Sequence, residues 1–392
     1  MEKTPDFLQE AKRIKDDLII IRRGIHKNPE LGNEERRTSR FIAKSLERLG
    51  LDVKMGRNEI GVIGSLNVND GGAVVCLRAD MDAIAITENT GVSYESRIPG
   101  VMHACGHDIH CAAVMGAAKI LCGFKNQLQG GVRFIFQPAE EIDLGAKAML
   151  EQGVLADPKP IGIFGLHVWP DLILGEVGIQ PGAVMASIDN FDVTFKGSSA
   201  HGAEPHLGRD ALLAASMSIV ALQQVIARSV DPYNPAVITV GKMRSGTARN
   251  IIADSASFSG TVRTLDAGVR RAIRDRVYET ILGCANACGV TAFIDYKQEL
   301  PVLVNSGTLA DMAIRAAKDT LGDSCIKKTK PSMAGDDFAL YAERIPGCYI
   351  FIGVSTPEQK APPLHSPEFN VDERVIPMAA ALLANVCWHM LR

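Results

Sequence analysis

Continuous apolar runs that alternate with helical patterns are the feature that most constrains the fold of this chain. The runs are predicted strands, and they occupy residues 73–77, 132–136, 161–166 and 348–352. Segments of helical composition separate the first three runs, and one of them, 108–121, is rich in Ala, Met and Val. A strand with no polar alternation is buried on both faces and needs helices to cover it. The pattern therefore predicts an α/β fold, in which helices flank a mostly parallel mixed sheet.

The middle of the chain follows a different pattern. Apolar and polar residues alternate in the predicted strands 188–195, 236–243 and 256–263, and long helical patterns cover 210–229 and 267–287. Strands of period two are typical of an antiparallel sheet with one face in water. We expect residues 185–300 to form a smaller α+β domain, inserted into a larger domain made of residues 1–184 and 301–392.

The composition narrows the class of protein. The 392 residues carry a net charge of −3, and 46% are hydrophobic and 22% charged, as in ordinary soluble globular proteins. Basic residues form no long run, so nucleic acid is not an expected partner. No apolar stretch approaches the ~20 residues of a membrane helix, and the N-terminal segment lacks the apolar core of a signal peptide. Nine cysteines, an odd number, indicate no disulfide framework, and we expect a cytoplasmic protein.

Residues suited to metal binding cluster near the ends of the apolar runs. Cys105 and His107 are separated by one glycine, and thiolate and imidazole both bind zinc-like metals. The pair Glu140–Glu141 follows one run and His167 follows another, while His365 lies in a Pro-rich loop. Each alone has a structural explanation, as an acidic turn at a helix start, a core histidine or a surface histidine. Because parallel sheets bind ligands at the carboxyl ends of their strands, we expect these side chains to converge.

The number of candidate ligands exceeds what one zinc ion needs. A tetrahedral site takes at most four protein ligands. This chain offers Cys105, His107, Glu141, His167 and His365. Five ligands, of which the Cys105 thiolate can bridge, suit two divalent metals ~3.5–4 Å apart. Zinc, manganese, cobalt and nickel are all candidates, because availability and geometry decide which metal occupies such a site.

Two acids have predicted roles beside the metals. Adjacent side chains diverge, so Glu141 can bind metal while Glu140 faces a water. Asp80 and Asp82 lie two residues apart after a buried strand. We expect Asp82 to hydrogen-bond a metal-bound imidazole and to fix its orientation. His110 lies inside the helical segment that follows, where a structural role is expected.

Three segments that carry these residues resemble a known family. Residues 78–82, 102–107 and 136–141 are similar to the aminoacylase and carboxypeptidase family of dinuclear metallopeptidases, in its amidohydrolase branch. That branch includes hippurate hydrolases, N-acyl-amino-acid hydrolases and plant auxin-conjugate hydrolases. The resemblance implies a catalytic domain that binds two divalent metals through the five ligands above, with Glu140 as the general base. It also implies that the inserted domain is a lid or dimerisation domain.

The resemblance extends to residues of the inserted domain. His201 would stabilise the oxyanion, in cis or from across a dimer, and Asn250 and Arg263 would contact the substrate carboxylate. The chain departs from the family at Asp336, where a glutamate is usual, which leaves the role of that acid open. It also departs at 142–144, which replaces a glycine-rich turn and could reshape the pocket.

The leading hypothesis is a metal-dependent hydrolase for the amide bond of N-acyl amino acids, with an acetyl, benzoyl or similar acyl group. Glu140 would take a proton from water and then give one to the leaving amine. A carboxypeptidase or dipeptidase of the same family is the alternative. Two other classes stay open, namely a Cys105 nucleophile with His107 as base, and a metal-storing or regulatory binding protein. We expect a small-molecule substrate, no membrane partner, and a homodimer or higher homo-oligomer.

Overall fold

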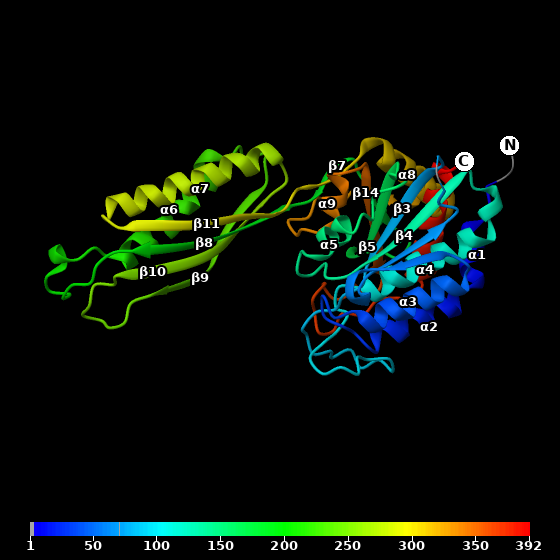
Figure 1. Ribbon diagram of the computed structural model, residues 1–392, viewed down its shortest axis with the longest axis horizontal. Coiled ribbons are helices and arrows are strands. Elements are labelled where there is room, and N and C mark those ends of the chain that lie inside the picture. Colours follow the sequence, from blue (N-terminus) through cyan, green and yellow to red (C-terminus); the bar gives the residue numbers. More distant parts are fainter. Residues whose placement is uncertain (1–3, 70) are drawn as a thin grey trace. The chain divides into compact units, whose positions relative to one another are not determined.

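Two compact units make up the part of the chain that the computed structural model describes, residues 4–69 and 71–392 (Figure 1). The larger unit contains the chain up to Gly182, Val304–Lys330 and Asp336–Arg392, and the smaller unit contains Ala183–Leu303 and Pro331–Gly335. The predicted boundaries differ by a few residues and assign Pro331–Gly335 to the larger domain. These residues belong to the smaller unit because its backbone pairs with them, as where Ala186 donates its N–H to the carbonyl oxygen of Ala334 at 2.9 Å.

The larger unit is built on an eight-stranded mixed sheet. Its strands, in spatial order, are β1 (Asp52–Met55), β2 (Val62–Leu66), β4 (Gly130–Gln137), β3 (Ala73–Asp80), β5 (Gly162–Ile173), β14 (Gly347–Ser355), β6 (Val177–Gly178) and β13 (Ile326–Lys327). The central strands β4, β3, β5 and β14 are parallel, whereas β2 runs antiparallel to β4 and to β1. The predicted mostly parallel mixed sheet is confirmed.

Helices cover both faces of this sheet. Successive side chains of a strand point to opposite faces, and every side chain of β4 and β14 is buried. The helices of the unit are α1 (Phe7–Arg13), α2 (Lys15–His26), α3 (Arg36–Arg48), α4 (His107–Gly123), α5 (Gly145–Glu151), α8 (Gly307–Leu321), α9 (Phe338–Ala342) and α10 (Val375–Met390). Helix α4 is almost wholly buried, because it packs against α2 and α10 and also onto β3.

Strand β5 runs further than the sequence predicts. It continues to Ile173, so His167 lies inside the strand. The sequence prediction, which places His167 after the end of the strand, is wrong on this point. Pairing with β14 continues to Ile173, but the described pairing with β3 ends at Gly165. His167 therefore lies beyond the paired part of β3, near the carboxyl end of that strand, although it is internal to its own strand.

The smaller unit is a four-stranded antiparallel sheet with two helices on one face (Figure 1). The strands, in spatial order, are β11 (Thr291–Leu300), β8 (Ser187–Lys196), β10 (Ser255–Thr264) and β9 (Ala236–Ser245), and the helices are α6 (Ala211–Ser229) and α7 (Ala267–Ala287). Along β8, buried Phe191, Val193 and Phe195 alternate with exposed residues, so one face of the sheet is dry and the other wet. The predicted α+β insert is confirmed.

Several short or weakly patterned elements are absent from the sequence prediction. They include β11, α8, α9, β6, β13, the paired strands β7 (Gly182–Met185) and β12 (Leu303–Asn305), and 3-10 turns at Arg57–Glu59, Lys125–Gln127, Pro205–Leu207 and Asp323–Cys325. Strand β11 is an edge strand that only half-buries Ala292, Ile294 and Tyr296, and the exposed Phe293 between them obscures the alternation in its sequence. The buried face of α8 is mostly alanine, which also gives a weak hydrophobic signal.

Helix α6 corrects the expectation that no apolar stretch of the chain approaches the length of a membrane helix. Of the described helices, it alone is long and apolar enough, by length and composition, to cross a membrane. In the structure it packs against α7 and β9 and buries Ala214, Leu222 and Val225 in the core of the smaller unit. These contacts are the ones that a helix packed by one face on a folded domain makes, while Leu213, Met217 and Val220 stay exposed.

Candidate metal centre

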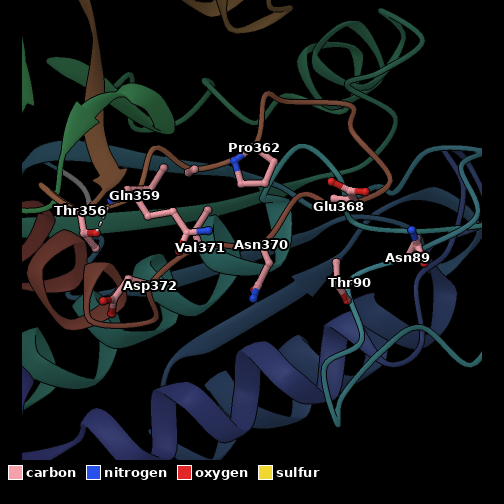
Figure 2. Close-up of a pocket in the computed structure, with 11 residues that line it drawn as sticks. Asn89, Thr90, Thr356, Gln359, Pro362, Glu368, Asn370, Val371 and Asp372 are labelled. Carbon is pink, nitrogen blue, oxygen red and sulfur yellow. Dashed lines mark hydrogen bonds between the residues drawn. The ribbon is translucent and has the colours of Figure 1, made fainter.

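A pocket of about 520 Å³ lies beside the loop that carries His365 (Figure 2). Its lining is largely polar and comprises Asn89, Thr90, Val354, Thr356, Gln359, Ala361, Pro362, Glu368, Asn370, Val371 and Asp372. None of the five predicted ligands lines this pocket. The candidate site is therefore a cluster of side chains elsewhere in the larger unit.

His107 begins helix α4, and the turn before it depends on Gly106. Gly106 has a φ of +87°, and a Cβ there would lie 2.5 Å from Cγ2 of Val168. Nδ1 of His107 lies 2.9 Å from the carbonyl oxygen of Asp82 and 3.2 Å from its carboxylate. Both oxygens are acceptors, so Nδ1 carries the proton of the neutral ring, and the lone pair of that ring is on Nε2. This is the contact that the sequence predicts for Asp82.

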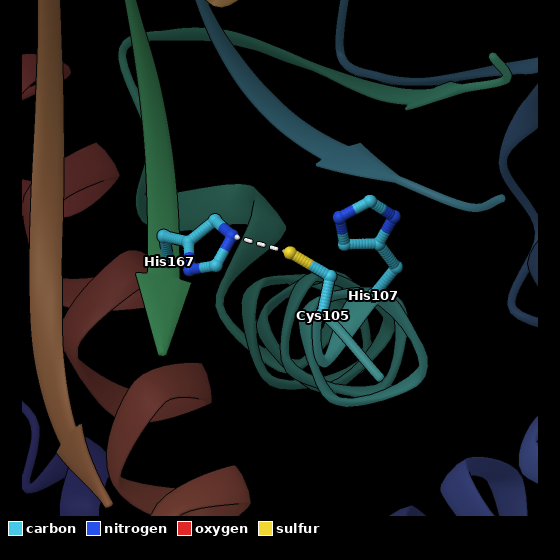
Figure 3. Close-up of side chains that lie close together, drawn as sticks. All are labelled: Cys105, His107 and His167. Carbon is cyan, nitrogen blue, oxygen red and sulfur yellow. Dashed lines mark hydrogen bonds between the residues drawn. The ribbon is translucent and has the colours of Figure 1, made fainter. Parts of the chain in front are cut away.

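Cys105 and His167 come together from the turn before α4 and from β5 (Figure 3). Sγ of Cys105 lies 3.4 Å from Nε2 of His167. Nδ1 of His167 donates to the carbonyl oxygen of Val168 at 2.7 Å, which leaves Nε2 free to face the thiol. Figure 3 shows the sulfur of Cys105 between the imidazoles of His107 and His167, and the ligand atoms of the three lie within 4.8 Å of one another. A thiolate in this place can bridge two cations.

Glu141 and His365 complete the predicted set. Oε1 of Glu141 lies 3.3 Å from Nε2 of His365 and 3.8 Å from Nε2 of His107. The backbone N–H of Glu141 donates to the carboxylate of Asp82 at 2.9 Å, so Asp82 holds two of the predicted ligands. The N–H of His365 donates to the carbonyl oxygen of Ala104 at 2.8 Å, which ties its loop to the turn that carries the thiol. The structure brings all five residues together, and their role as metal ligands stays a prediction.

The centre has more acidic than basic groups, and the pKa values reflect this. Burial, Glu141 and Glu140 raise the pKa of the Cys105 thiol well above its usual range. Burial opposes a charged His107, but nearby carboxylates, Asp80 first among them, outweigh it and raise the His107 pKa to about 10. These are the shifts of a site that lacks positive charge, and bound cations would supply it.

Divalent metals fit these residues on two grounds. Nε2 of His107 is buried and has no hydrogen-bond partner among the described residues. Such an unpartnered group costs about 1–3 kcal/mol, and coordination would remove that cost. The donors are a thiolate, imidazole nitrogens and a carboxylate oxygen, which zinc, manganese, cobalt and nickel all accept to different degrees. The residues therefore fit the predicted pair of divalent cations.

Glu140 lies between the predicted ligands and a second group of acids. Its Oε2 is 3.9 Å from Nε2 of His107, and its carboxylate lies within 4.8 Å of those of Asp336 and Asp337. Burial, Asp336 and Glu141 raise the pKa of Glu140 well above its usual range. A carboxylate whose protonated form is favoured in this way can accept a proton and return it, as a general base and acid must.

Arg78 is a buried cation of this region that the sequence did not predict as part of the site. Its guanidinium donates to Asp80 at 2.6 Å, to Asp337 at 2.8 Å and, through Nε, to Gln137 at 2.9 Å. The available signal is a charged residue within β3, a strand that is otherwise apolar over 73–77. Because Arg78 pairs with Asp80 and Asp337, it gathers the acids that lie behind the predicted ligands.

Asp80 and His110 lie next to the predicted ligands and form hydrogen bonds with other groups of the protein. The carboxylate of Asp80 accepts from Arg78 and from Nδ1 of His110, at 2.6 Å in each case. Nε2 of His110 accepts the N–H of Val168 at 3.1 Å. Both ring nitrogens of His110 and both oxygens of Asp80 therefore have protein partners, although Asp80, His107 and His110 also form one of the described groups that could hold a metal ion. The structural role of His110 stays a prediction.

The predicted substrate contacts belong to the smaller unit. His201 forms an antiparallel bridge with Ile251, the residue after Asn250, so His201 and Asn250 are neighbours. Nδ1 of His201 accepts the N–H of Ala203 at 3.1 Å, so the proton of a neutral His201 is on Nε2. Arg263 lies apart from this turn, near the far end of β10.

Comparison with known proteins agrees with the geometry. Residues 76–389 match peptidase family M20/M25/M40. The N-acetyl-L-cysteine deacetylase of Bacillus subtilis (strain 168) is 38% identical, over 94% of this chain and 87% of the relative. IAA-amino acid hydrolase ILR1-like 5 of Arabidopsis thaliana is also 38% identical, over 98% of this chain and 90% of the relative. The crystal structure of the Bacillus subtilis YXEP protein, a dinuclear metal-binding peptidase from the M20 family, has a TM-score of 0.85 at 34% identity and covers 97% of this chain and 99% of that one.

Proposed function

This chain belongs to peptidase family M20/M25/M40, and from that premise we propose that it hydrolyses the amide bond of N-acyl amino acids. Membership makes it a dinuclear metal-dependent amidohydrolase or peptidase. The observation that carries the proposal is the convergence of the five predicted ligands in overlapping groups, one of which, that of His107 and Glu141, also includes Glu140. Relatives named N-acetyl-L-cysteine deacetylase and IAA-amino acid hydrolase support the choice of substrate class.

Each residue has a separate task in the proposed reaction. Metal ions bound at the centre would polarise the amide carbonyl and lower the pKa of water. Glu140 takes the proton from the attacking water and passes it to the leaving amine. Asp82 and the carbonyl oxygen of Val168 hold the Nδ1 protons of His107 and His167, and so keep each Nε2 directed inward.

The smaller unit supplies the proposed contacts to the substrate. His201, with its proton on Nε2, is the proposed donor to the developing oxyanion, in cis or from a partner chain. Asn250 and Arg263 are the proposed contacts of the substrate carboxylate, because an amide and a guanidinium both donate to carboxylate oxygens.

The turn after Glu141 favours an apolar acyl group. Ile142 and Leu144, which replace the expected glycine-rich turn, leave 48% and 49% of their surface exposed. Both side chains lie within three residues of a predicted metal ligand. We therefore propose that they contact the acyl group, and that an acyl group with apolar surface, such as benzoyl, is preferred to acetyl.

A homodimer is also part of the proposal, and two features of the smaller unit support it. Helix α6 exposes Leu213, Met217 and Val220, which share one helix face because they are four and three residues apart. Strand β9 is an edge strand and leaves a row of backbone groups to be paired. A second copy of the chain could cover both. A monomeric mass by light scattering after gel filtration would contradict this.

The test of the function is a screen of metal-reconstituted protein. Zinc, manganese, cobalt and nickel forms would each be assayed on N-acetyl and N-benzoyl amino acids, blocked peptides and dipeptides. The highest kcat/KM is expected on N-acyl amino acids. A higher value on peptides would favour the carboxypeptidase or dipeptidase alternative. Activity that survives chelation, with a covalent acyl-enzyme, would favour a Cys105 nucleophile, and metal binding without turnover would favour a binding protein.

A further inference from the structure

The turn that carries Glu140 and Glu141 has a backbone that needs support. It joins β4 to α5, and two of its residues that are not glycine, Ala139 and Asp143, have φ values of +52° and +58°. The left-handed region is sterically unfavourable for residues with a side chain. Such a conformation persists where surrounding groups determine it. The contacts that hold this turn therefore bear directly on where the Glu140 carboxylate points.

Carboxylates from three distant segments hold the turn, each by accepting a backbone N–H. Oε1 of Glu35 accepts from Ala139 at 2.7 Å, Oδ2 of Asp82 from Glu141 at 2.9 Å, and Oδ2 of Asp337 from Ala146 at 2.8 Å. Asp82 and Asp337 also have other partners in the centre, namely His107 and Arg78. Glu35 has no such second partner among the described residues, and its bond is to the residue immediately before Glu140.

Glu35 is fully buried at the start of helix α3. Its Oε2 has no hydrogen-bond partner among the described residues, and the bond to Ala139 is the one that its carboxyl group makes to another segment of the described chain. The loop before Glu35 also approaches Ala139 closely at Gly32, where a Cβ would lie 3.2 Å from the Cα of Ala139. Burying an acid is unfavourable, and one backbone hydrogen bond offsets only part of that free-energy cost. The arrangement points to a functional need for that bond.

We propose that Glu35 is a positioning residue, which directs the Glu140 carboxylate by accepting the N–H of Ala139. The inference rests on the proposed function, since it concerns the base of that reaction. Glu35 acts through Ala139, and it belongs to none of the described groups of side chains that could hold a metal. A displacement of about 1 Å in a reacting group can lower a rate ~10²-fold, so a small movement of this turn is enough to matter.

Three variants test the role of the Glu35 oxygen. Glu35→Met keeps the length of the side chain but removes the acceptor, and it should lower kcat ~10–100-fold with KM within ~3-fold and both metals retained. Glu35→Gln keeps a carbonyl oxygen for Ala139 and should restore kcat to within ~3-fold of the wild type. The matched control is Glu34→Met, since Glu34 is the exposed neighbour, and it should leave kcat unchanged.

Two further readouts separate positioning from general stability. Metal content by elemental analysis should stay at two per chain in all variants. Hydrogen–deuterium exchange of the peptide over 138–144 should rise in Glu35→Met and stay at the wild-type level in Glu35→Gln. In a Glu140→Gln background, Glu35→Met should cost little further activity, because the group that it positions no longer transfers protons.

Normal kcat in Glu35→Met would overturn the proposal, and so would an equal loss in Glu35→Met and Glu35→Gln. If Glu35→Met does not fold, Glu35→Asp decides, because it stays polar but withdraws the oxygen from Ala139 by one methylene. Glu35→Asp should lower kcat, and wild-type kcat in it would overturn the role. A wild-type protein inactive on every N-acyl amino acid would instead defeat the proposed function. The exchange comparison would still decide whether Glu35 holds the turn.

Discussion

The two units present most of their predicted functional residues differently. In the larger unit Cys105, His107 and His167 are buried, and hydrogen bonds determine where the two imidazoles point, while Glu141 is half-buried and His365 is exposed. In the smaller unit His201 and Asn250 are exposed and are placed by backbone pairing. The buried side chains already converge and need only the cations, whereas the exposed groups gain partners only when substrate or another surface reaches them. Metal binding should therefore depend on the larger unit, and catalysis on both.

Removal of the metals should have the largest effect. Dialysis against a chelator should abolish activity, and it should lower the thermal stability of the larger unit, because its acid-rich centre then has no cations. A ligand present at 1,000 times its Kd stabilises by about 4 kcal/mol, so the shift in Tm should be readily measured. Readdition of the metal should restore both properties. Full activity in metal-free protein would contradict the claim that the larger unit contributes to catalysis by binding metals.

Glu140→Gln should lower kcat by ~10²–10⁴-fold while both metals remain bound. The amide cannot take a proton from water, but the five predicted ligands are untouched. Steady-state kinetics with elemental analysis would check this. Near-normal turnover would refute the assignment of the base and would leave the larger unit as a binding site only.

His201→Ala should lower kcat by ~10²–10³-fold with unchanged metal content, since it removes a donor to the oxyanion and no ligand. The contrasting variant is His167→Ala in the larger unit, which should lose metal. His206→Ala is the matched control, because His206 is an exposed histidine of the same smaller unit. Loss of metal in His201→Ala would contradict the division of labour between the units.

The buried larger unit should also carry a pH dependence of stability. Burial raises the pKa of Glu35 from 4.5 to about 8, so folding favours its protonated form. That contribution is complete below pH 4.5 and is lost as the pH rises through about 8. Glu35→Gln cannot ionise, so it should match the wild type at pH 4 and be more stable at pH 9 by at most a few kcal/mol, at about 1.4 kcal/mol per pKa unit. Urea denaturation at both pH values, with Glu34→Gln as control, would show this. A difference that is the same at both would contradict it.

The smallest expected effect concerns the acyl group. Ile142→Gly should lower the ratio of kcat/KM for N-benzoyl over N-acetyl substrates by about 3–10-fold, because it removes apolar surface beside the centre. Metal content should not change. An unaltered ratio would mean that Ile142 does not contact the acyl group, and would move specificity to the smaller unit.

The parts of the fold that could be predicted are those whose burial leaves a regular pattern. Strands β3 and β4 are buried on both faces, so their sequences are mostly apolar, and β8 alternates because one of its faces is wet. Strand β11 lies at an edge and only half-buries Ala292, Ile294 and Tyr296, and exposed Phe293 interrupts its apolar–polar alternation. Helix α6 shows the converse, because a helix that packs on one side of a domain can match a membrane helix in composition. The cytoplasmic location and the absence of a nucleic-acid partner stay predictions.

The candidate site was predictable in its members but not in its contacts. Thiol, imidazole and carboxylate groups could be recognised as ligands because their chemistry is local to each residue. Glu35 could not be recognised, because its partner Ala139 is 104 positions away in the chain. The same holds for Arg78, whose partner Asp337 is 259 positions away.

Residue types and their alternation were enough to predict the sheet, the insert and the candidate ligands. The folded structure was needed to show which nitrogen of His107 is available, which acid holds Glu141, and that His167 lies within its strand. The reason is physical: periodicity and side-chain chemistry belong to short stretches of chain, whereas a hydrogen bond depends on neighbours that folding alone brings together.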